Sequence, residues 1–222
     1  MLECSYVTYI PRLTNYFLLM PWGLARFHQS RQSHFITFGC NHRHRLFTHN
    51  ESCRIFESAL ERTRRSYRLY IYGYVIMPDH VHLLLSEPQH DDGPLKQDGG
   101  PFKPDVGLSG DFQDYTLADA LKSLKQGVSR RLIRDAEHFW QKRYYDFNIR
   151  NRAQFMEKLT YIHQNPVKAG LCERPEDWPW SSFRHYATGA EGRVEIESEW
   201  TERKRERAAG RLCPAVKLPY SS

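Results

Sequence analysis

Residues 69–86 read LYIYGYVIMPDHVHLLLS, and this stretch decides the fold. Residues 69–77 are rich in aromatic and β-branched side chains, a composition that predicts a β-strand. Pro78 and Asp79 are typical turn residues, and residues 80–86 form a second apolar run. We therefore expect two antiparallel strands joined by a tight turn.

The segments before this hairpin predict one strand and one helix. Residues 33–40 alternate Phe and Thr with Ile and Phe, which is typical of a strand packed on both faces. Thr48 and Glu51 have the spacing of a capping box, and apolar residues then recur at helical spacing. This pattern predicts a helix that ends near Tyr67.

The segments after the hairpin predict two more helices. A leucine and valine stripe from Thr116 to about residue 132 indicates a long amphipathic helix. A last helix is predicted over about residues 151–165, and Pro166 should end it. The order of elements predicts an α+β fold of ferredoxin-like type, in which helices pack mainly on one face of an antiparallel sheet.

A chain of 222 residues favours one domain over two. We expect this domain to cover residues 22–188, after an extension over residues 1–21 and before a charged tail over residues 189–222. Residues 89–114 are rich in Gly, Pro and Asp and poor in apolar side chains, which predicts a flexible acidic insertion.

Charge and cysteine usage narrow the class of protein. The net charge is +6, and because residues 89–114 carry −4, the rest of the chain carries +10. This excess favours a polyanionic partner. The five cysteines are scattered without a C-x-x-C pair, which argues against a disulfide framework or a Cys-rich zinc module and favours the cytoplasm. No apolar run is long enough to span a membrane, and none has the shape of a signal peptide.

His80 and His82 are candidate metal ligands. Side chains two apart on a strand share a face, so the two imidazoles project together, opposite Val81 and Leu83. Such a pair suits a divalent ion with positions left open for water and substrate oxygens. Taken alone, His-x-His is better explained by two polar residues on a half-exposed strand.

The last helix adds a phenol and a carboxamide. Asn165 lies about 40° from Tyr161 around the helix, whereas Phe155, Leu159 and Ile162 lie roughly 100° to 160° from Tyr161. Tyr161 is therefore expected to lie away from the buried face. A metal that polarises a phosphodiester oxygen would assist attack by this phenol and yield a phosphotyrosine link.

Three long motifs occur in fixed order: GYVIMPDHVHLLL at residues 73–85, FWQKRYYD at residues 139–146 and YIHQNPVKAGL at residues 161–171. They resemble the REP-associated tyrosine transposases, which belong with the single-tyrosine HUH transposases of small bacterial insertion sequences. The similarity extends from about Leu24 to Tyr186. An acidic insertion as long as residues 89–114 is not expected for this family.

The resemblance implies an HUH nuclease domain that nicks single-stranded DNA near a hairpin and leaves a 5′-phosphotyrosine and a free 3′-OH. It implies that Tyr161 is the nucleophile, that His80 and His82 bind Mg²⁺ or Mn²⁺, and that Asn165 is the third polar ligand. The expected partner is single-stranded or hairpin DNA, and the family leaves monomer and homodimer open.

Cations that could hold this DNA lie in three segments. They occur on the polar side of the helix after Thr116, in the aromatic and basic run at residues 139–147, and in the last helix with the residues just after it. The candidate DNA-binding residues are Lys122, Lys125, Arg130, Arg131, Lys142, Arg143, Lys158 and Lys168. Each basic group taken singly is more often a solvated surface.

Two other functions are consistent with the same residues. A non-catalytic hairpin DNA- or RNA-binding protein would use the sheet and the basic helix without cutting. A metal-dependent hydrolase that acts through water would need His80 but not Tyr161.

Overall fold

The computed structural model describes residues 33–89, 115–133 and 139–209. The predicted extension over residues 1–21 and almost all of the predicted acidic insertion lie outside the described residues. The main elements, in chain order, are β1 (Ser33–Gly39), α2 (Asn50–Ser66), β2 (Ile71–Ile76), β3 (His80–Ser86), α3 (Leu117–Leu132), β4 (Tyr145–Ile149) and α4 (Arg152–Lys168). Shorter elements are η2 (Asn41–Arg43), η3 (Pro175–Asp177), α5 (Phe183–Thr188) and α6 (Glu199–Ala208).

The four strands form one antiparallel sheet in the order β2-β3-β1-β4. Together with α2 and α3 in the chain order β-α-β-β-α-β, this arrangement is the ferredoxin-like topology. The predicted fold class and the predicted β2-β3 hairpin are therefore confirmed. The run at residues 139–147 supplies the start of β4, an edge strand of the sheet.

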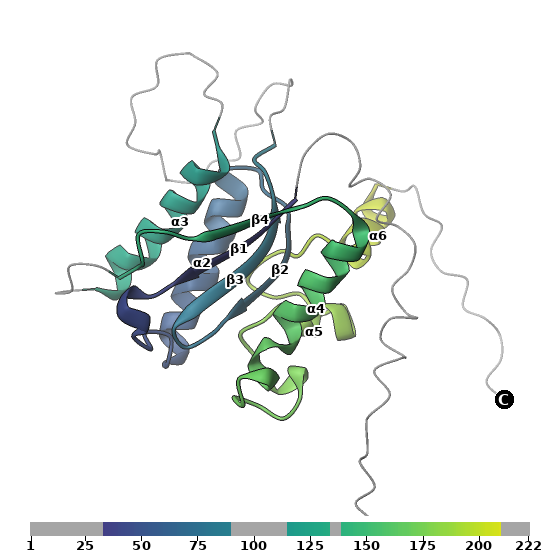
Figure 1. The fold of residues 1–222 in the computed structure, drawn as a ribbon. Helices are drawn as coiled ribbons and strands as arrows, with labels where there is room; N and C mark the ends of the chain where they lie inside the picture. Colours follow the sequence, from purple (N-terminus) through teal and green to yellow (C-terminus); the bar gives the residue numbers. More distant parts are fainter. Residues whose placement is uncertain (1–32, 90–114, 134–138, 210–222) are drawn as a thin grey trace, which may run out of the picture.

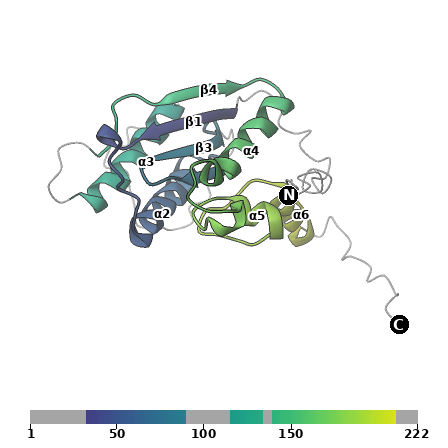
Figure 2. The same ribbon diagram turned by 60° about the horizontal axis from the view of Figure 1, so that its bottom comes forward.

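Helices cover both faces of the sheet, in contrast to the expectation that they pack mainly on one. The first face carries α2 and α3, which pack against each other, and the second carries α4, which lies across β2 and β3 (Figures 1 and 2). The strands can hold helices on both sides because β1, β2 and β3 bury side chains in both directions.

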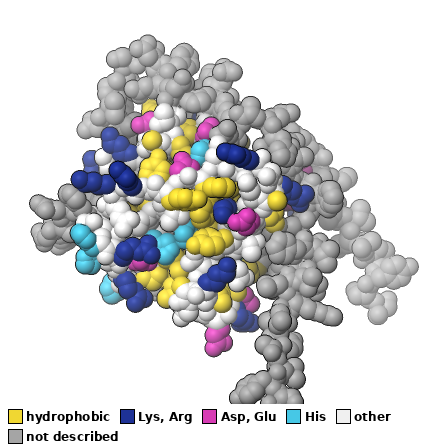
Figure 3. Space-filling model, viewed as in Figure 1, with side chains coloured by type: hydrophobic (Ala, Val, Ile, Leu, Met, Phe, Trp, Pro, Cys, Tyr) yellow, Lys and Arg dark blue, Asp and Glu magenta, His cyan; other side chains and the backbone are white. Residues whose placement is uncertain are grey.

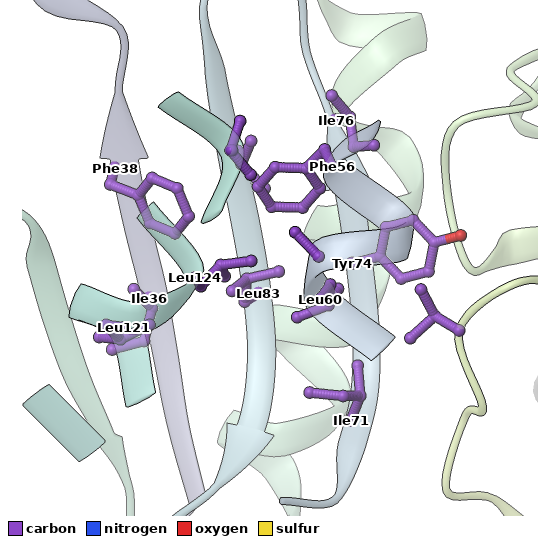
Figure 4. Close-up of a cluster of buried hydrophobic side chains, with 14 of the residues drawn as sticks. Ile36, Phe38, Phe56, Leu60, Ile71, Tyr74, Ile76, Leu83, Leu121 and Leu124 are labelled. Atoms are coloured by element: carbon purple, nitrogen blue, oxygen red, sulfur yellow. The ribbon is translucent and has the colours of Figure 1, made fainter. Parts of the chain in front are cut away.

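The larger core lies between the sheet and the α2/α3 pair (Figure 4). Ile36 and Phe38 from β1 and Leu83 from β3 meet Phe56 of α2 and Leu124 of α3 there, and all five are almost fully buried. Side chains along β3 point alternately to the two faces of the sheet, and those that point into this core are apolar. His82 therefore lies on the other face.

The smaller core fixes the position of α4. Leu159 and Ile162 of α4 pack against Val75 and Leu84 of the sheet. The helix comes close to β2 at Gly73, where a Cβ atom would lie 2.7 Å from Leu159 Cδ1. A residue without a side chain at this point lets α4 approach the sheet closely.

Two predicted helix ends differ from the structure. The N-cap of α2 is His49 and no side chain caps this helix, so the capping box predicted at Thr48 does not form. Pro166 lies inside α4, which runs on to Lys168. The helix continues because Pro166 lacks only its own N–H, while the N–H of Ala169 still donates to the carbonyl of Asn165.

The described part of the segment predicted as a tail packs on the domain. Val194 and Ile196 are buried in the larger core, and the N–H of Glu197 donates to the carbonyl of Ile71. Helix α6 follows, and Arg205 on it binds the carboxylates of Glu195 and Glu197. Within the described ranges, no helix has the length and apolar character that crossing a bilayer requires.

Candidate active site

The two histidines face α4 from the middle of the sheet. His82 lies opposite Thr37 in the β1-β3 register, and residues paired in this way share a face. His80 lies two residues earlier on β3, at its first position after the turn. Phe35 stacks on the ring of His82, with the two ring centroids 5.4 Å apart.

The two imidazoles point their Nε2 atoms at each other, 3.1 Å apart. Their other nitrogens have partners: Nδ1 of His80 lies 2.6 Å from Oδ1 of Asp79, and Nδ1 of His82 lies 2.7 Å from the hydroxyl of Thr37. Arg43 forms an ion pair with Asp79 at 2.9 Å. A carboxylate only accepts hydrogen bonds, so Nδ1 of His80 carries a proton, which leaves Nε2 as the nitrogen with a lone pair in the neutral form of the ring.

Helix α4 brings the predicted carboxamide and phenol to this pair. Nδ2 of Asn165 donates to Nε2 of His82 over 3.0 Å, which makes that nitrogen an acceptor as well. The ring of Tyr161 meets the ring of His82 edge-on, with centroids 5.2 Å apart. Asn165 is 9% exposed, whereas Tyr161 is 38% exposed and its hydroxyl has no hydrogen-bond partner among the described residues.

The site keeps His82 neutral. Its pKa falls from 6.5 to about 3, mainly because the ring is buried; His80 and Arg43 add smaller lowering effects, and Asp79 opposes them. A neutral imidazole is the form that binds metal ions.

The donor set fits a divalent ion with open positions. Adjacent ligands of an octahedral ion at 2.1 Å are separated by about 3.0 Å, close to the distance between the two Nε2 atoms. When both rings are neutral, their two Nε2 lone pairs face each other at this distance, an arrangement that a cation between them would stabilise. The third candidate ligand is an amide, and the described residues hold no group of three or more His, Cys, Asp or Glu side chains that could hold a metal.

Two of the predicted cations lie beside Tyr161. The Nζ of Lys168 lies 5.6 Å from the centre of the Tyr161 ring. The Nζ of Lys158 lies over the rings of Phe35 and Phe147, and also 2.9 Å from a carboxylate oxygen of Glu157. Figure 3 shows histidine surface on this side of the molecule, bordered by Lys and Arg side chains and by apolar ones.

The other predicted cations lie farther from the two histidines. Lys122, Arg130 and Arg131 are exposed on α3, across the sheet from Tyr161. Lys142 and Arg143 are exposed just before β4. These five side chains stay candidates for contact with DNA.

The ammonium of Lys125 contacts the protein itself, whereas the sequence predicts that it contacts DNA. Its Nζ donates to the carbonyl of Gln141 over 2.9 Å, and the ammonium lies 5.8 Å from the centre of the Phe38 ring. Partial burial lowers its pKa. In this position the side chain ties α3 to the segment before β4.

Thr37, Asp79 and Phe35 belong to the site but are not predicted from the sequence. Asp79 could have been found because it directly precedes His80, although it also reads as a turn residue. Thr37 and Phe35 follow from the pairing of β1 with β3, which the sequence does not specify.

Comparison with known proteins shows which proteins this chain resembles in sequence and fold. The family model described as "Transposase IS200 like" matches residues 28–92. A Haemophilus influenzae protein, provisionally described as a REP-associated tyrosine transposase, is 30% identical over 140 residues, which cover 58% of this chain and 66% of that protein. The REP-associated tyrosine transposase of Escherichia coli (strain K12) is 26% identical over 143 residues, 64% of this chain and 70% of that one.

A solved structure extends the comparison to the fold. It shows a REP-associated tyrosine transposase bound to a REP hairpin, and it matches 75% of this chain and 86% of its own with a TM-score of 0.54 and 22% identity. Residues 28–92 are thus similar to the IS200-like transposase class. Over a longer stretch the chain is similar to the REP-associated tyrosine transposases, and it spans about two thirds of the length of these relatives.

Proposed function

We propose that this protein is a DNA strand transferase that nicks single-stranded DNA next to a hairpin through a 5′-phosphotyrosine intermediate. The observation that carries the proposal is the meeting of Tyr161 and Asn165 from α4 with His80 and His82 from β3. A protein that only binds DNA has no need of a half-exposed phenol beside two converging imidazoles.

The reaction is a transesterification at phosphorus. The phenol oxygen of Tyr161 forms a bond to the phosphorus atom and gives up its proton to solvent, while the bond to the 3′ oxygen breaks and that oxygen takes up a proton from solvent. The products are a 5′-phosphotyrosine and a free 3′-OH, and attack by a 3′-OH reverses the link. No oxidant or reductant is required.

His80, His82 and Asn165 would hold Mg²⁺ or Mn²⁺. When bound, such an ion neutralises charge that develops on the phosphodiester oxygens. Asp79 and Thr37 orient the two imidazoles through their Nδ1 atoms.

The net positive charge of the chain and its similarity to a DNA-bound protein support the proposed DNA partner. The excess of Lys and Arg favours a polyanion, and the related solved protein is bound to a REP hairpin. Lys168 and Lys158 lie where they can attract a phosphate toward Tyr161.

The decisive test is a covalent adduct on a denaturing gel. The protein is incubated with Mn²⁺ and hairpin oligonucleotides that carry single-stranded flanks. The Tyr161→Phe variant should lose the adduct completely, because it lacks the attacking oxygen. Tyr70→Phe is the matched control: Tyr70 is also 38% exposed but lies beside Ser86, at the other end of β3 from His80, and this variant should keep the adduct.

Other results would point to the two alternative functions. Adduct formation by Tyr161→Phe would refute the assignment of Tyr161 as the nucleophile. DNA cleavage by Tyr161→Phe with loss of cleavage in His80→Ala would indicate a hydrolase that acts through water. Tight hairpin binding that survives metal chelation, without any adduct from the unmodified protein, would indicate a non-catalytic binding protein.

A further inference from the structure

Tyr145, the first residue of β4, is an exposed aromatic side chain beside the candidate active site. Among the large hydrophobic residues that the structure describes, it has the highest exposed fraction, 55%. It lies on an edge strand, where no further strand covers it within the described part of the sheet. Core packing does not occupy this ring, so its exposed part is free to contact a ligand.

The sheet register places Tyr145 in line with His82. Tyr145 is paired with Thr37 on β1, and Thr37 is paired with His82 on β3. Residues paired directly across strands share a face, so all three side chains stand on the α4 face. Two strand spacings separate the backbones of Tyr145 and His82, which is about 10 Å.

Aromatic contacts connect this ring with the nucleophile. The Phe35 ring meets the Tyr145 ring edge-on at 6.4 Å and the Tyr161 ring edge-on at 5.8 Å. Phe35 itself is buried and stacked on His82, so it fixes the floor between the two tyrosines. The ammonium of Lys158 lies over Phe35 and Phe147 on the same side of the sheet.

The other aromatic residues of the run before β4 have different positions. Phe139 is buried, and Trp140 packs on the same core, where its indole N–H donates to the carbonyl of Lys125. Tyr144 precedes β4 and is 36% exposed. Only Tyr145 combines high exposure with a place on the face of Tyr161 and His82 within the described residues.

We propose that Tyr145 is a base-stacking subsite, which holds an unpaired base of the nucleotide that flanks the phosphate attacked by Tyr161. This inference rests on the proposed function. An unpaired base suits the position because every base offers a flat face, and nearby ammonium groups suit its phosphates. Tyr145 is thus a substrate-positioning residue, and it would help to select the phosphate that is cleaved.

Binding measurements without cleavage test this subsite. The Tyr161→Phe variant serves as the parent, and the probe is a fluorescent DNA hairpin with a single-stranded flank of mixed sequence. Tyr145→Ala should weaken binding about 5- to 150-fold, the range that loss of one stacked base produces. Tyr145→Phe keeps the ring and should bind like the parent. Tyr144→Ala, a change at the neighbouring exposed tyrosine, should also bind like the parent.

A second probe identifies the base as the partner. In a series of hairpins that each lack one base, the parent should bind more weakly when the missing base is at one particular flank position. The Tyr145→Ala variant should show no further loss of affinity when the base at that position is missing. An equal loss for a hairpin that lacks the flank would overturn the proposal. Unchanged binding by Tyr145→Ala would also overturn the proposal. A change in the oligomeric state of this variant, measured by sedimentation, would overturn it too, because it would indicate that β4 contacts a second copy.

The two proposals can fail separately. Stacking at Tyr145 without any adduct from the unmodified protein would leave a binding subsite without the proposed chemistry. An adduct that is insensitive to Tyr145→Ala, with unchanged DNA affinity, would retain the chemistry and remove the subsite.

Discussion

Asp79 connects the turn of the hairpin with the chemistry of the site. Its carboxylate accepts from Nδ1 of His80 and pairs with Arg43, so it fixes the direction in which Nε2 of His80 points. Neither contact is required for the turn itself, which Pro78 and Asp79 form by their backbone preferences.

The Asp79→Asn change tests this role at the scale of one residue. The amide keeps the shape but removes the charge that makes the imidazole a better ligand, so the concentration of Mn²⁺ needed for half-maximal adduct should rise about 10- to 100-fold. Glu173→Gln, which removes an exposed carboxylate elsewhere, should leave the Mn²⁺ dependence unchanged. An unchanged dependence for Asp79→Asn would show that the carboxylate does not tune the site.

Single residues also show what the sequence could predict of the site. Period-two alternation on β3 correctly separates His82 from Val81 and Leu83, because each strand residue sees only one face. Helical spacing likewise predicts the exposure of Tyr161. Thr37 and Phe35 escape prediction because their place beside His82 depends on which strands pair and in which register.

Helix α4 is the element on which the site depends most. It carries Tyr161 and Asn165, and its distance from the sheet is set where Leu159 packs over Gly73. Sequence patterns predict that this helix exists but place its end too early, since one missing N–H at Pro166 does not stop a helix that is packed on a sheet.

Gly73→Ala tests the close approach of α4 to β2. The added methyl group would overlap Leu159 and push the helix outward, so the free energy of unfolding should fall by about 1–3 kcal/mol. The rate of adduct formation should fall too, because Tyr161 and Asn165 move away from His82. Both effects can be measured by urea denaturation and by the gel assay.

Gly127→Ala provides the control within another helix. A Cβ at Gly127 of α3 would have no neighbour closer than 3.9 Å, so alanine should be neutral or should stabilise the protein by up to about 1 kcal/mol. If Gly73→Ala were as stable and as active as the parent, the contact with Leu159 would not determine the position of α4.

At the scale of the whole molecule, stability should depend on pH through buried histidines. His163 is buried against Ser182, with Nε2 lying 2.9 Å from the Oγ atom, and burial lowers its pKa to about 3. The unfolded chain takes up a proton at this residue below about pH 6.5, whereas the folded chain does not until about pH 3. The free energy of unfolding therefore falls as the pH decreases through this window.

The His163→Gln change isolates this contribution. One such histidine contributes a slope of about 1.4 kcal/mol per pH unit, so between pH 7 and pH 5 the variant should lose about 2 kcal/mol less stability than the unmodified protein. The measurement is the free energy of unfolding in urea at both pH values. Equal losses in the two proteins would show that His163 is protonated in the folded state.

The whole fold also limits what local patterns can predict. The order of helices and strands follows from the sequence, and it leads to the correct ferredoxin-like topology. The position of residues 189–208 does not follow from the sequence, because their charge predicts a solvated tail. The few apolar residues among them, such as Val194 and Ile196, are buried in the core.

The contact between His82 and Asn165 joins positions 83 residues apart in the chain. A nascent polypeptide that has left the ribosome only as far as β4 already holds both imidazoles, yet neither the phenol nor the carboxamide. The proposed cutting activity would therefore arise late in synthesis, once α4 has emerged and docked, and shortened translation products that stop before Tyr161 should be harmless to nearby DNA.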